Sequence, residues 1–167
     1  MSEKLKYVVG DATSPISDSD IRLIIHCCND IGGWGRGFVL ALSKRDSTPE
    51  KLFRSWANGS IGACEYELGN IQICPFVEEG LCVANMVGQH GISTVNGTPP
   101  IRYDSIAACL LKVKEWVKVK EAEGKSVTVH APRFGAGLAG GRWDWIESLI
   151  VDNLCDSDID VTIYDMK

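Results

Sequence analysis

A glycine-rich loop with polar residues at its start is the stretch of this sequence best suited to chemistry. Asn29 and Asp30 follow an apolar run, and glycines then occupy positions 32, 33, 35 and 37. Glycines let backbone N–H groups approach an anion closely and adopt the positive φ angles that an anion cradle needs. The pattern predicts a phosphate-binding loop at the carboxyl end of a strand, where α/β proteins place their ligands.

A second glycine-rich loop lies late in the chain, at residues 132–141. Gly135, Gly137 and Gly140 have the spacing G-x-G-x-x-G, but little chain follows for the acidic ribose partner of a dinucleotide-binding fold. Neither loop contains the lysine of a P-loop. Because each loop joins a strand to a helix, a shared phosphate or diphosphate site is favoured over the alternative of two independent tight turns.

Other residues with reactive side chains favour structural roles. No G-x-S-x-G motif occurs, and the apolar run around Cys27 and Cys28 indicates buried thiols rather than nucleophiles. His26 could act as a base, but a hydrogen-bonded structural histidine at a strand end is the favoured interpretation. For Asp30, orienting or deprotonating a water and capping a turn stay equal alternatives. The sequence has no C-x-x-C, and its three histidines are far apart, so no metal site is expected.

Helical patterns alternate with mostly apolar strands, which indicates a layered α/β domain. Ser47 and Glu50 have the spacing of a capping box, which predicts a helix start at Ser47. Residues 92–101 lack periodicity and are interpreted as a mobile surface loop that borders a pocket. Strands are expected at residues 5–9, 21–28, 69–75, 81–87, 126–131 and 161–164, and helices at residues 38–45, 47–57, 103–123 and 143–154.

Four loops at strand ends are expected to form the walls of one crevice. They comprise residues 10–13, 29–37, 85–91 and 132–141.

Length and composition limit the class of protein. The 167 residues suit one domain, and the net charge of −5, with 17 basic residues that form no run, argues against nucleic-acid binding. The seven cysteines lie mostly in apolar segments, which favours reduced core residues and a cytoplasmic setting. We expect no signal peptide and no membrane attachment, because no apolar run is long enough to span a bilayer.

Three motifs lie at predicted strand ends: Y-V-V-G-D-A-T at residues 7–13, I-H-C-C-N-D-I-G-G-W-G-R-G at residues 25–37 and P-R-F-G-A-G-L at residues 132–138. Taken together, they resemble the macrodomain family. The resemblance covers nearly the whole chain, and V-A-N-M-V-G-Q-H-G at residues 83–91 is similar to bacterial stand-alone members. It is closest to the compact branch of terminal ADP-ribose protein glycohydrolase, ADP-ribose 1″-phosphate phosphatase and bacterial hydrolases. It implies a single macrodomain over residues 1–167, with a three-layer α/β/α fold and a central mixed, mostly parallel sheet.

The resemblance also implies a ligand. ADP-ribose would be the ligand or the product, with no cofactor and no metal. Asp11 would accept a hydrogen bond from the adenine amino group, and the backbone of Ala12 would meet the ring. The first glycine loop would wrap the distal ribose and diphosphate, and the second would close over the phosphates. The ligand-binding residues implied in these loops are Gly32, Gly33, Trp34, Gly35, Arg36, Gly37, Gly135, Ala136, Gly137 and Leu138.

The chemistry of the family transfers less directly. The glycohydrolase's catalytic lysine and aspartate are not matched, since residues 85–88 are N-M-V-G and the loop position is Ala139. A lysine adduct is therefore not expected. Instead, a phosphate oxygen, Asn29 and Asp30 would hold a water beside the ribosyl ester, while Gln89 or His90 would contact the leaving carboxylate or the ribose. Asn29, Asp30 and Gln89 are thus the catalytic candidates, and His90 is a ligand-binding candidate.

Three functions are compatible with this resemblance. The first is an ADP-ribosyl-protein hydrolase that removes mono-ADP-ribose from acidic side chains, or acts on related O-linked derivatives. The alternatives are a non-catalytic ADP-ribose reader and an ADP-ribose 1″-phosphate phosphatase. The expected partners are ADP-ribose and mono-ADP-ribosylated proteins, and the chain is expected to be a monomer.

Overall fold

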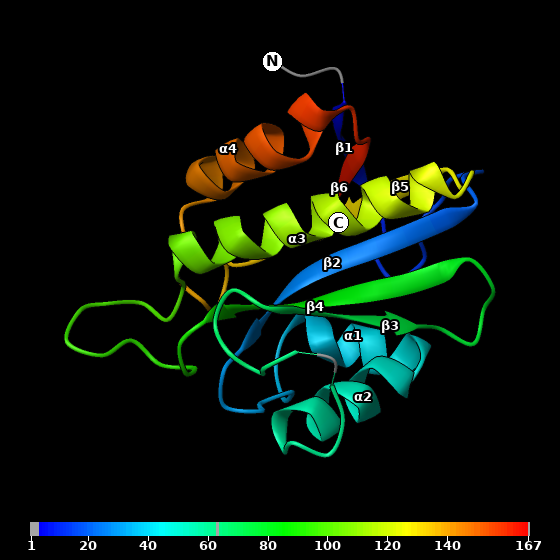
Figure 1. Cartoon of the computed structure of the whole chain (residues 1–167). Coiled ribbons are helices and arrows are strands. Elements are labelled where there is room, and N and C mark those ends of the chain that lie inside the picture. Colours follow the sequence, from blue (N-terminus) through cyan, green and yellow to red (C-terminus); the bar gives the residue numbers. More distant parts are fainter. Residues whose placement is uncertain (1–3, 63, 167) are drawn as a thin grey trace.

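Six strands form one sheet in the order β1-β6-β5-β2-β4-β3 (Figure 1). The computed structural model describes residues 4–62 and 64–166. All neighbouring strands are parallel except β3 and β4, which pair antiparallel. This arrangement confirms the predicted mixed, mostly parallel sheet. The strands are β1 (Leu5–Val9), β2 (Ile21–Asn29), β3 (Ile71–Pro75), β4 (Leu81–Gln89), β5 (Val127–Ala131) and β6 (Val161–Asp165).

Two helical layers cover the sheet, which makes the fold α/β/α. Figure 1 shows α1 (Phe38–Arg45) and α2 (Thr48–Ala57) on one face, and α3 (Tyr103–Ala122) and α4 (Trp143–Asn153) on the other. A short 3₁₀ helix, η1 (Cys155–Ser157), follows α4. All four helices predicted from the sequence are present.

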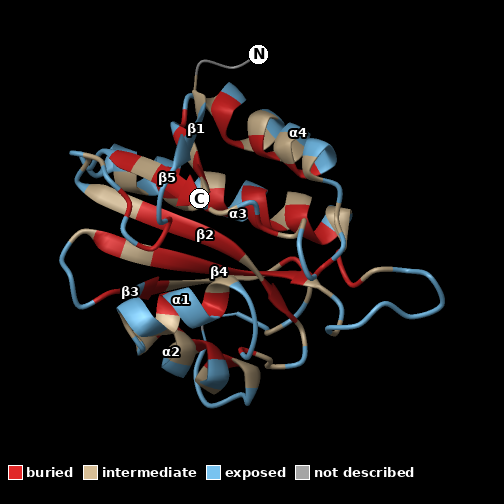
Figure 2. Cartoon of the chain, turned by 180° about the vertical axis from the view of Figure 1, so that it is seen from behind, coloured by how far each residue is buried: buried red, intermediate tan, exposed pale blue. Residues whose placement is uncertain are grey.

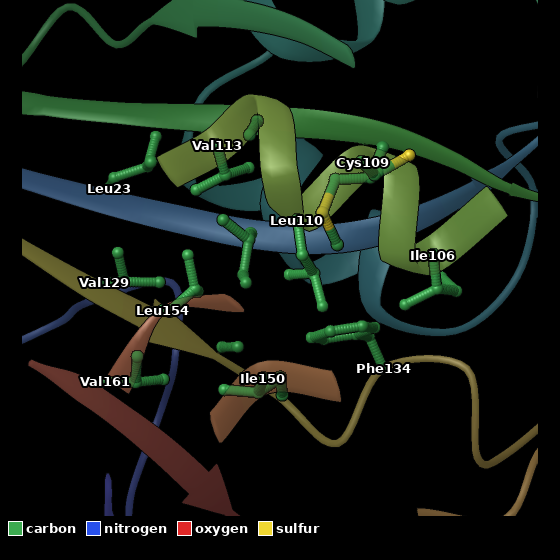
Figure 3. Close-up of a cluster of buried hydrophobic side chains, with 14 of the residues drawn as sticks. Leu23, Ile106, Cys109, Leu110, Val113, Val129, Phe134, Ile150, Leu154 and Val161 are labelled. Atoms are coloured by element: carbon green, nitrogen blue, oxygen red, sulfur yellow. The ribbon is translucent and has the colours of Figure 1, made fainter. Parts of the chain in front are cut away.

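The central strands carry apolar side chains on both faces because both faces are covered by helices. Leu23 and Ile25 of β2 pack into the core beneath α3 and α4, whereas Ile24 packs into the core beneath α1 and α2. Buried residues accordingly run along β2 and β4 (Figure 2). Figure 3 shows the larger core, in which Leu110 of α3 and Ile150 of α4 lie in one cluster with strand residues. Each fully buried aliphatic side chain of this kind contributes roughly 1.5–3 kcal/mol.

The start of α2 differs from the capping box predicted there, and that prediction is wrong. Ser47 itself is helical and makes no side-chain cap. The carboxylate of Asp46 accepts the Thr48 N–H at 2.8 Å instead, and its other oxygen accepts the Val77 N–H at 2.8 Å. Asp46 can do this because its backbone is extended. The carboxylate therefore links α2 to the β3–β4 hairpin.

The segment of residues 92–101 is partly ordered by a tight turn. Val95 and Thr98 exchange two backbone hydrogen bonds of 3.0 Å. Asn96 and Gly97 between them both have positive φ angles, of 53° and 78°. Asn-Gly is the dipeptide that favours such two-residue turns. The aperiodic segment therefore contains a small hairpin of its own, whose tip is exposed.

Most of the cysteines lie at buried positions, as the apolar segments around them predict. The described residues include all seven cysteines and contain no disulfide bond, and four of these cysteines are buried. Within residues 4–62 and 64–166, no helix is both long and apolar enough to cross a membrane.

Candidate functional site

Two adjoining cavities lie at the carboxyl edge of the parallel strands. The first has a volume of about 660 Å³ and lies at the ends of β1 and β6, where Asp11 and Tyr164 line it. The second has a volume of about 750 Å³ and lies at the ends of β5, β2 and β4. Phe38 and Pro132 line both. The two cavities thus form a crevice that follows the strand order from β1 to β4, and each has the volume of a small-molecule site.

Most of the sequence-predicted residues are brought together in this crevice. Asp11 and Ala12 line the first cavity. The predicted residues that line the second are Asn29, Gly33, Trp34, Gly35, Arg36, Gly37, Gln89, Gly135, Gly137 and Leu138. Asp30, Gly32, His90 and Ala136 line neither cavity.

The loop in the first cavity is held by side chains rather than by regular structure. Asp11 accepts hydrogen bonds from the Thr13 N–H at 2.9 Å and the Thr13 hydroxyl at 2.7 Å. Arg45 of α1 donates from Nε to the Thr13 carbonyl at 3.2 Å and forms an ion pair with Glu78. One oxygen of Asp11 is therefore used in the turn, while the side chain lines the cavity.

Asn29 holds the first glycine loop in place. Its Oδ1 accepts the N–H groups of Ile31 at 3.1 Å and Gly33 at 2.9 Å, and its Nδ2 donates to the Gly33 carbonyl at 3.1 Å. The side chain also lines the second cavity. A β-carbon on Gly33 would lie 2.8 Å from Asn29 Nδ2, so a larger residue there would displace the Asn29 amide. The geometry gives Asn29 a clear part in shaping the loop.

Tyr66 also holds the first glycine loop, although no pattern in the sequence indicates it. Its hydroxyl accepts the Gly32 N–H at 2.7 Å and donates to the Asn29 carbonyl at 2.7 Å. Burial raises the pKa of Tyr66 to about 12, although the hydrogen bond from Gly32 by itself lowers it. The phenol therefore stays protonated at neutral pH. The residue lies in an irregular segment outside any periodic pattern, so only the tertiary contact reveals its part in bracing the loop.

Trp34 belongs as much to the core as to the cavity wall. The residue is 4% exposed, and its Nε1 donates to Ser43 at 2.7 Å. It packs against His26 and Phe53, with ring centroids 5.6 and 5.2 Å away. An aromatic anchor of this kind fixes the glycine loop to the helices beneath it.

The two glycine loops face each other across the second cavity. A β-carbon on Gly37 would lie 3.6 Å from Leu138 Cδ1, and Leu138 itself is 63% exposed. The second loop is closed by a hydrogen bond of 2.7 Å from the Gly141 N–H to the Gly135 carbonyl. A ligand in this cavity would therefore lie between the loops.

The start of α1 is suited to an anion. Its N-cap residue is Gly37, so no side chain caps the first N–H groups of the helix. No acidic residue occupies the first turn. Arg36 lines the cavity beside it and makes no hydrogen bond or ion pair with another described residue. Unpaired N–H groups and the helix dipole favour negative charge at this point.

Asp30 is directed toward the end of β4. Its carboxylate accepts the Gly91 N–H at 2.7 Å and lies 2.7 Å from His90 Nδ1. Partial burial by itself raises the pKa of Asp30, but the hydrogen bonds from Gly91 and His90 outweigh it and hold the pKa below its usual value. Asp30 is therefore an ionised carboxylate at neutral pH that ties the first glycine loop to residues 90 and 91.

The buried reactive groups are not poised for catalysis. Burial lowers the pKa of His26 to about 4, against a hydrogen bond to Asn85 at 2.6 Å that raises it. Burial also raises the pKa values of the Cys27 and Cys28 thiols. Neutral thiols are weak nucleophiles, so the geometry agrees with their structural interpretation. Among the residues that the structure describes, no group of His, Cys, Asp and Glu is arranged to hold a metal ion.

Stability is expected to decrease as the pH falls below about 6.5. His130, like His26, is buried and has its pKa lowered to about 4, first by burial and then by the charge of Arg22. The unfolded chain takes up these protons near the ordinary value of 6.5, whereas the folded chain does so only near 4, so stability is lost through this interval. Urea unfolding at about pH 7.5 and about pH 5.5 should show a loss of roughly 1 kcal/mol for each histidine.

A substitution separates this effect from other titrations. In His130→Gln the loss over the same pH interval should be smaller by roughly 1 kcal/mol. A pH dependence identical to that of the unsubstituted chain would show that His130 is not responsible.

Fold and site define a three-layer α/β/α domain with a ligand crevice at the carboxyl edge of its sheet. No protein-family profile matches the chain. A solved structure of a macrodomain protein from Streptomyces coelicolor is 43% identical, with a TM-score of 0.79, and the match covers 96% of this chain and 98% of that one. This chain belongs to the macrodomain family.

Two further relatives are less similar in sequence. The chain is 32% identical to chromodomain-helicase-DNA-binding protein 1-like of Danio rerio over 96% of its own length, but it spans only 15% of the length of that relative. It is 24% identical to ADP-ribose 1″-phosphate phosphatase of Candida albicans, and the match covers 90% of this chain and 95% of that one.

Proposed function

We propose that the crevice binds ADP-ribose, with adenine in the first cavity and the diphosphate and distal ribose in the second. The observation that carries this proposal is the adjoining pair of cavities, which share Phe38 and Pro132 and lie beside both glycine loops. ADP-ribose is elongated and has an aromatic end. This end, the adenine, would lie in the first cavity near Asp11 and Ala12. Membership in the macrodomain family supports the same ligand.

Charge in the second cavity supports a diphosphate there. The protein carries a net charge of −5, yet no Asp or Glu occurs among the described residues that line this cavity. Arg36 and Arg133 line it, together with the start of α1, and Arg54 lines it beside Gly32. An acidic protein can bind an anion when backbone N–H groups and a few arginines provide a local positive field.

The reaction that we propose is hydrolysis of mono-ADP-ribose from acidic side chains of proteins, or from related O-linked derivatives. No lysine lines the second cavity within the described residues, so the proposal uses a positioned water. Asn29 and Gln89 line the cavity and would contact the sugar and the water. Asp30 would act from behind them by keeping residues 90 and 91 in place. Orientation with modest acid–base help accounts for large rate factors.

The test is to incubate the protein with a glutamate-linked ADP-ribosylated protein and measure free ADP-ribose. Release supports the enzyme, whereas binding without release supports the alternative of a reader. No carboxylate occurs among the described residues that line the second cavity, and this favours the reader alternative. A phosphatase acting on ADP-ribose 1″-phosphate is a further candidate, since the Candida albicans relative bears that name.

Substitution of Asn29 or Asp30 by alanine should lower the rate of hydrolysis. We expect losses on the order of 10²-fold for either variant, because each removes hydrogen bonds that place the first glycine loop against the substrate. Circular dichroism should first show that both variants are folded. If both variants retain the full rate, the catalytic assignment is wrong.

Tyr66→Phe should weaken ADP-ribose binding about fivefold and lower the free energy of unfolding by roughly 1–2 kcal/mol, because the Gly32 N–H and the Asn29 carbonyl lose their partner. Isothermal titration and urea unfolding measure the two effects. Tyr103→Phe is the matched control, since that hydroxyl accepts the Arg142 N–H at 2.8 Å away from the crevice. Equal binding by the two variants would contradict the bracing role of Tyr66.

A further inference from the structure

A series of hydrogen bonds runs from the core beneath the first glycine loop to an arginine in the crevice. Trp34 Nε1 donates to Ser43 Oγ at 2.7 Å, and Ser43 Oγ donates to Glu50 Oε1 at 2.8 Å. The other oxygen of Glu50 accepts Arg54 Nε at 2.9 Å. The hydrogen bond from Ser43, and then that from Arg54, lower the pKa of Glu50, which is therefore a carboxylate. Arg54 is thus held on its Nε side by a group anchored in the core.

The free edge of this guanidinium faces the crevice. Arg54 lines the second cavity, and its Nη1 lies 3.5 Å from the Gly32 carbonyl. Nη2 makes no hydrogen bond to any residue in the described part of the chain. Glu50 itself does not line the cavity. The carboxylate therefore orients the arginine without presenting negative charge to a ligand.

Arg54 lies at the end of the crevice away from Asp11. The crevice follows the strands from β1 to β4, and Arg54 comes from α2, which packs on β3 and β4. Under the proposed function, the adenine lies near Asp11 and the distal ribose lies toward β4. The diphosphate already has the start of α1, both glycine loops and Arg36. Arg54 lies beside Gly32, whereas the start of α1 is at Gly37, the other end of the same loop, so Arg54 is available to a second anion.

We propose that Arg54 is a specificity residue for a phosphate monoester carried on the distal ribose, as in ADP-ribose 1″-phosphate. This inference rests on the proposed binding of ADP-ribose. A guanidinium presents two parallel N–H groups that match the oxygens of a phosphate, and the pair is charge-assisted. The ester formed with an acidic side chain carries no charge at that carbon. Arg54 would therefore favour the phosphate derivative over both free ADP-ribose and the acyl ester.

The experiment is isothermal titration of the whole chain with ADP-ribose and with ADP-ribose 1″-phosphate, with chromatography after each titration to show that the phosphate is retained. We expect the unsubstituted protein to bind the phosphate derivative more tightly. Arg54→Ala should lower the ratio of the two affinities about tenfold, and Arg54→Lys should give an intermediate ratio because it keeps the charge but not the two parallel donors. The preference should also decrease at high salt, since Arg54 is half exposed.

Lys51→Ala is the matched control, because it removes one positive charge from the same helix at an exposed position that does not line the cavity. It should keep the ratio of the unsubstituted protein. A ratio in Arg54→Ala within twofold of that value would overturn the inference. If Arg54→Ala does not fold, the same twofold criterion is applied to the affinity ratio of Arg54→Lys. If neither ligand binds the unsubstituted chain, the proposed function itself fails.

Discussion

Gly37→Val is expected to weaken ADP-ribose binding about 100-fold, measured by isothermal titration. Gly37 has φ 79° and ψ −143°, a backbone conformation that is nearly restricted to glycine. A β-branched residue would have to change this conformation at the cap of α1, where the anion is expected to bind. Its side chain would also extend toward Leu138, since a β-carbon here already lies 3.6 Å from Leu138 Cδ1. The substitution therefore both disrupts the backbone that would bind the anion and narrows the crevice.

A matched control separates the effect of backbone strain from the effect on the binding site. Gly124 also has a positive φ angle, of 86°, but it follows α3, and a β-carbon there meets nothing within 4 Å. Gly124→Val should lower the free energy of unfolding by roughly 1–3 kcal/mol and leave binding unchanged. If Gly37→Val binds ADP-ribose within threefold of the unsubstituted chain, the proposed position of the diphosphate is wrong.

Phe53→Ala is expected to lower the free energy of unfolding by roughly 3–5 kcal/mol, the typical cost of removing a buried phenylalanine ring. Phe53 is fully buried, and its ring centroid lies 5.2 Å from that of Trp34 and 5.6 Å from that of Tyr66. These two neighbours hold the first glycine loop, so the cavity left by the ring should also loosen the loop. Urea unfolding gives the first effect, and titration with ADP-ribose gives the second.

Leu111→Ala provides the comparison, because Leu111 is 44% exposed on α3. Its cost should stay near or below about 1 kcal/mol, since the side chain is only partly buried. A loss below about 1 kcal/mol for Phe53→Ala would show that the core beneath α1 and α2 repacks around the gap, and the proposed link between this core and the glycine loop would then be wrong.

The regular elements were predictable because their patterns are local. The run Leu23-Ile24-Ile25 is apolar at every position, which predicts a strand covered on both faces, and β2 is such a strand. The start of α2 was predicted one residue away from the true capping group. Ser47 and Asp46 both have side chains that cap helices, and the choice of Asp46 depends on its hydrogen bond to Val77, 31 residues away.

The candidate site was likewise predictable only where local patterns define it. The sequence determined the composition of the crevice walls, since glycine, Asn29 and Asp11 fall at strand ends, and parallel strands end at one edge of the sheet. Only the tertiary structure decided how they are used. It directs Asp30 toward His90, and it brings Tyr66 to Gly32 and Arg54 to the far end of the crevice. These contacts join residues that share no periodic pattern, because they depend on how helices and loops pack across the sheet.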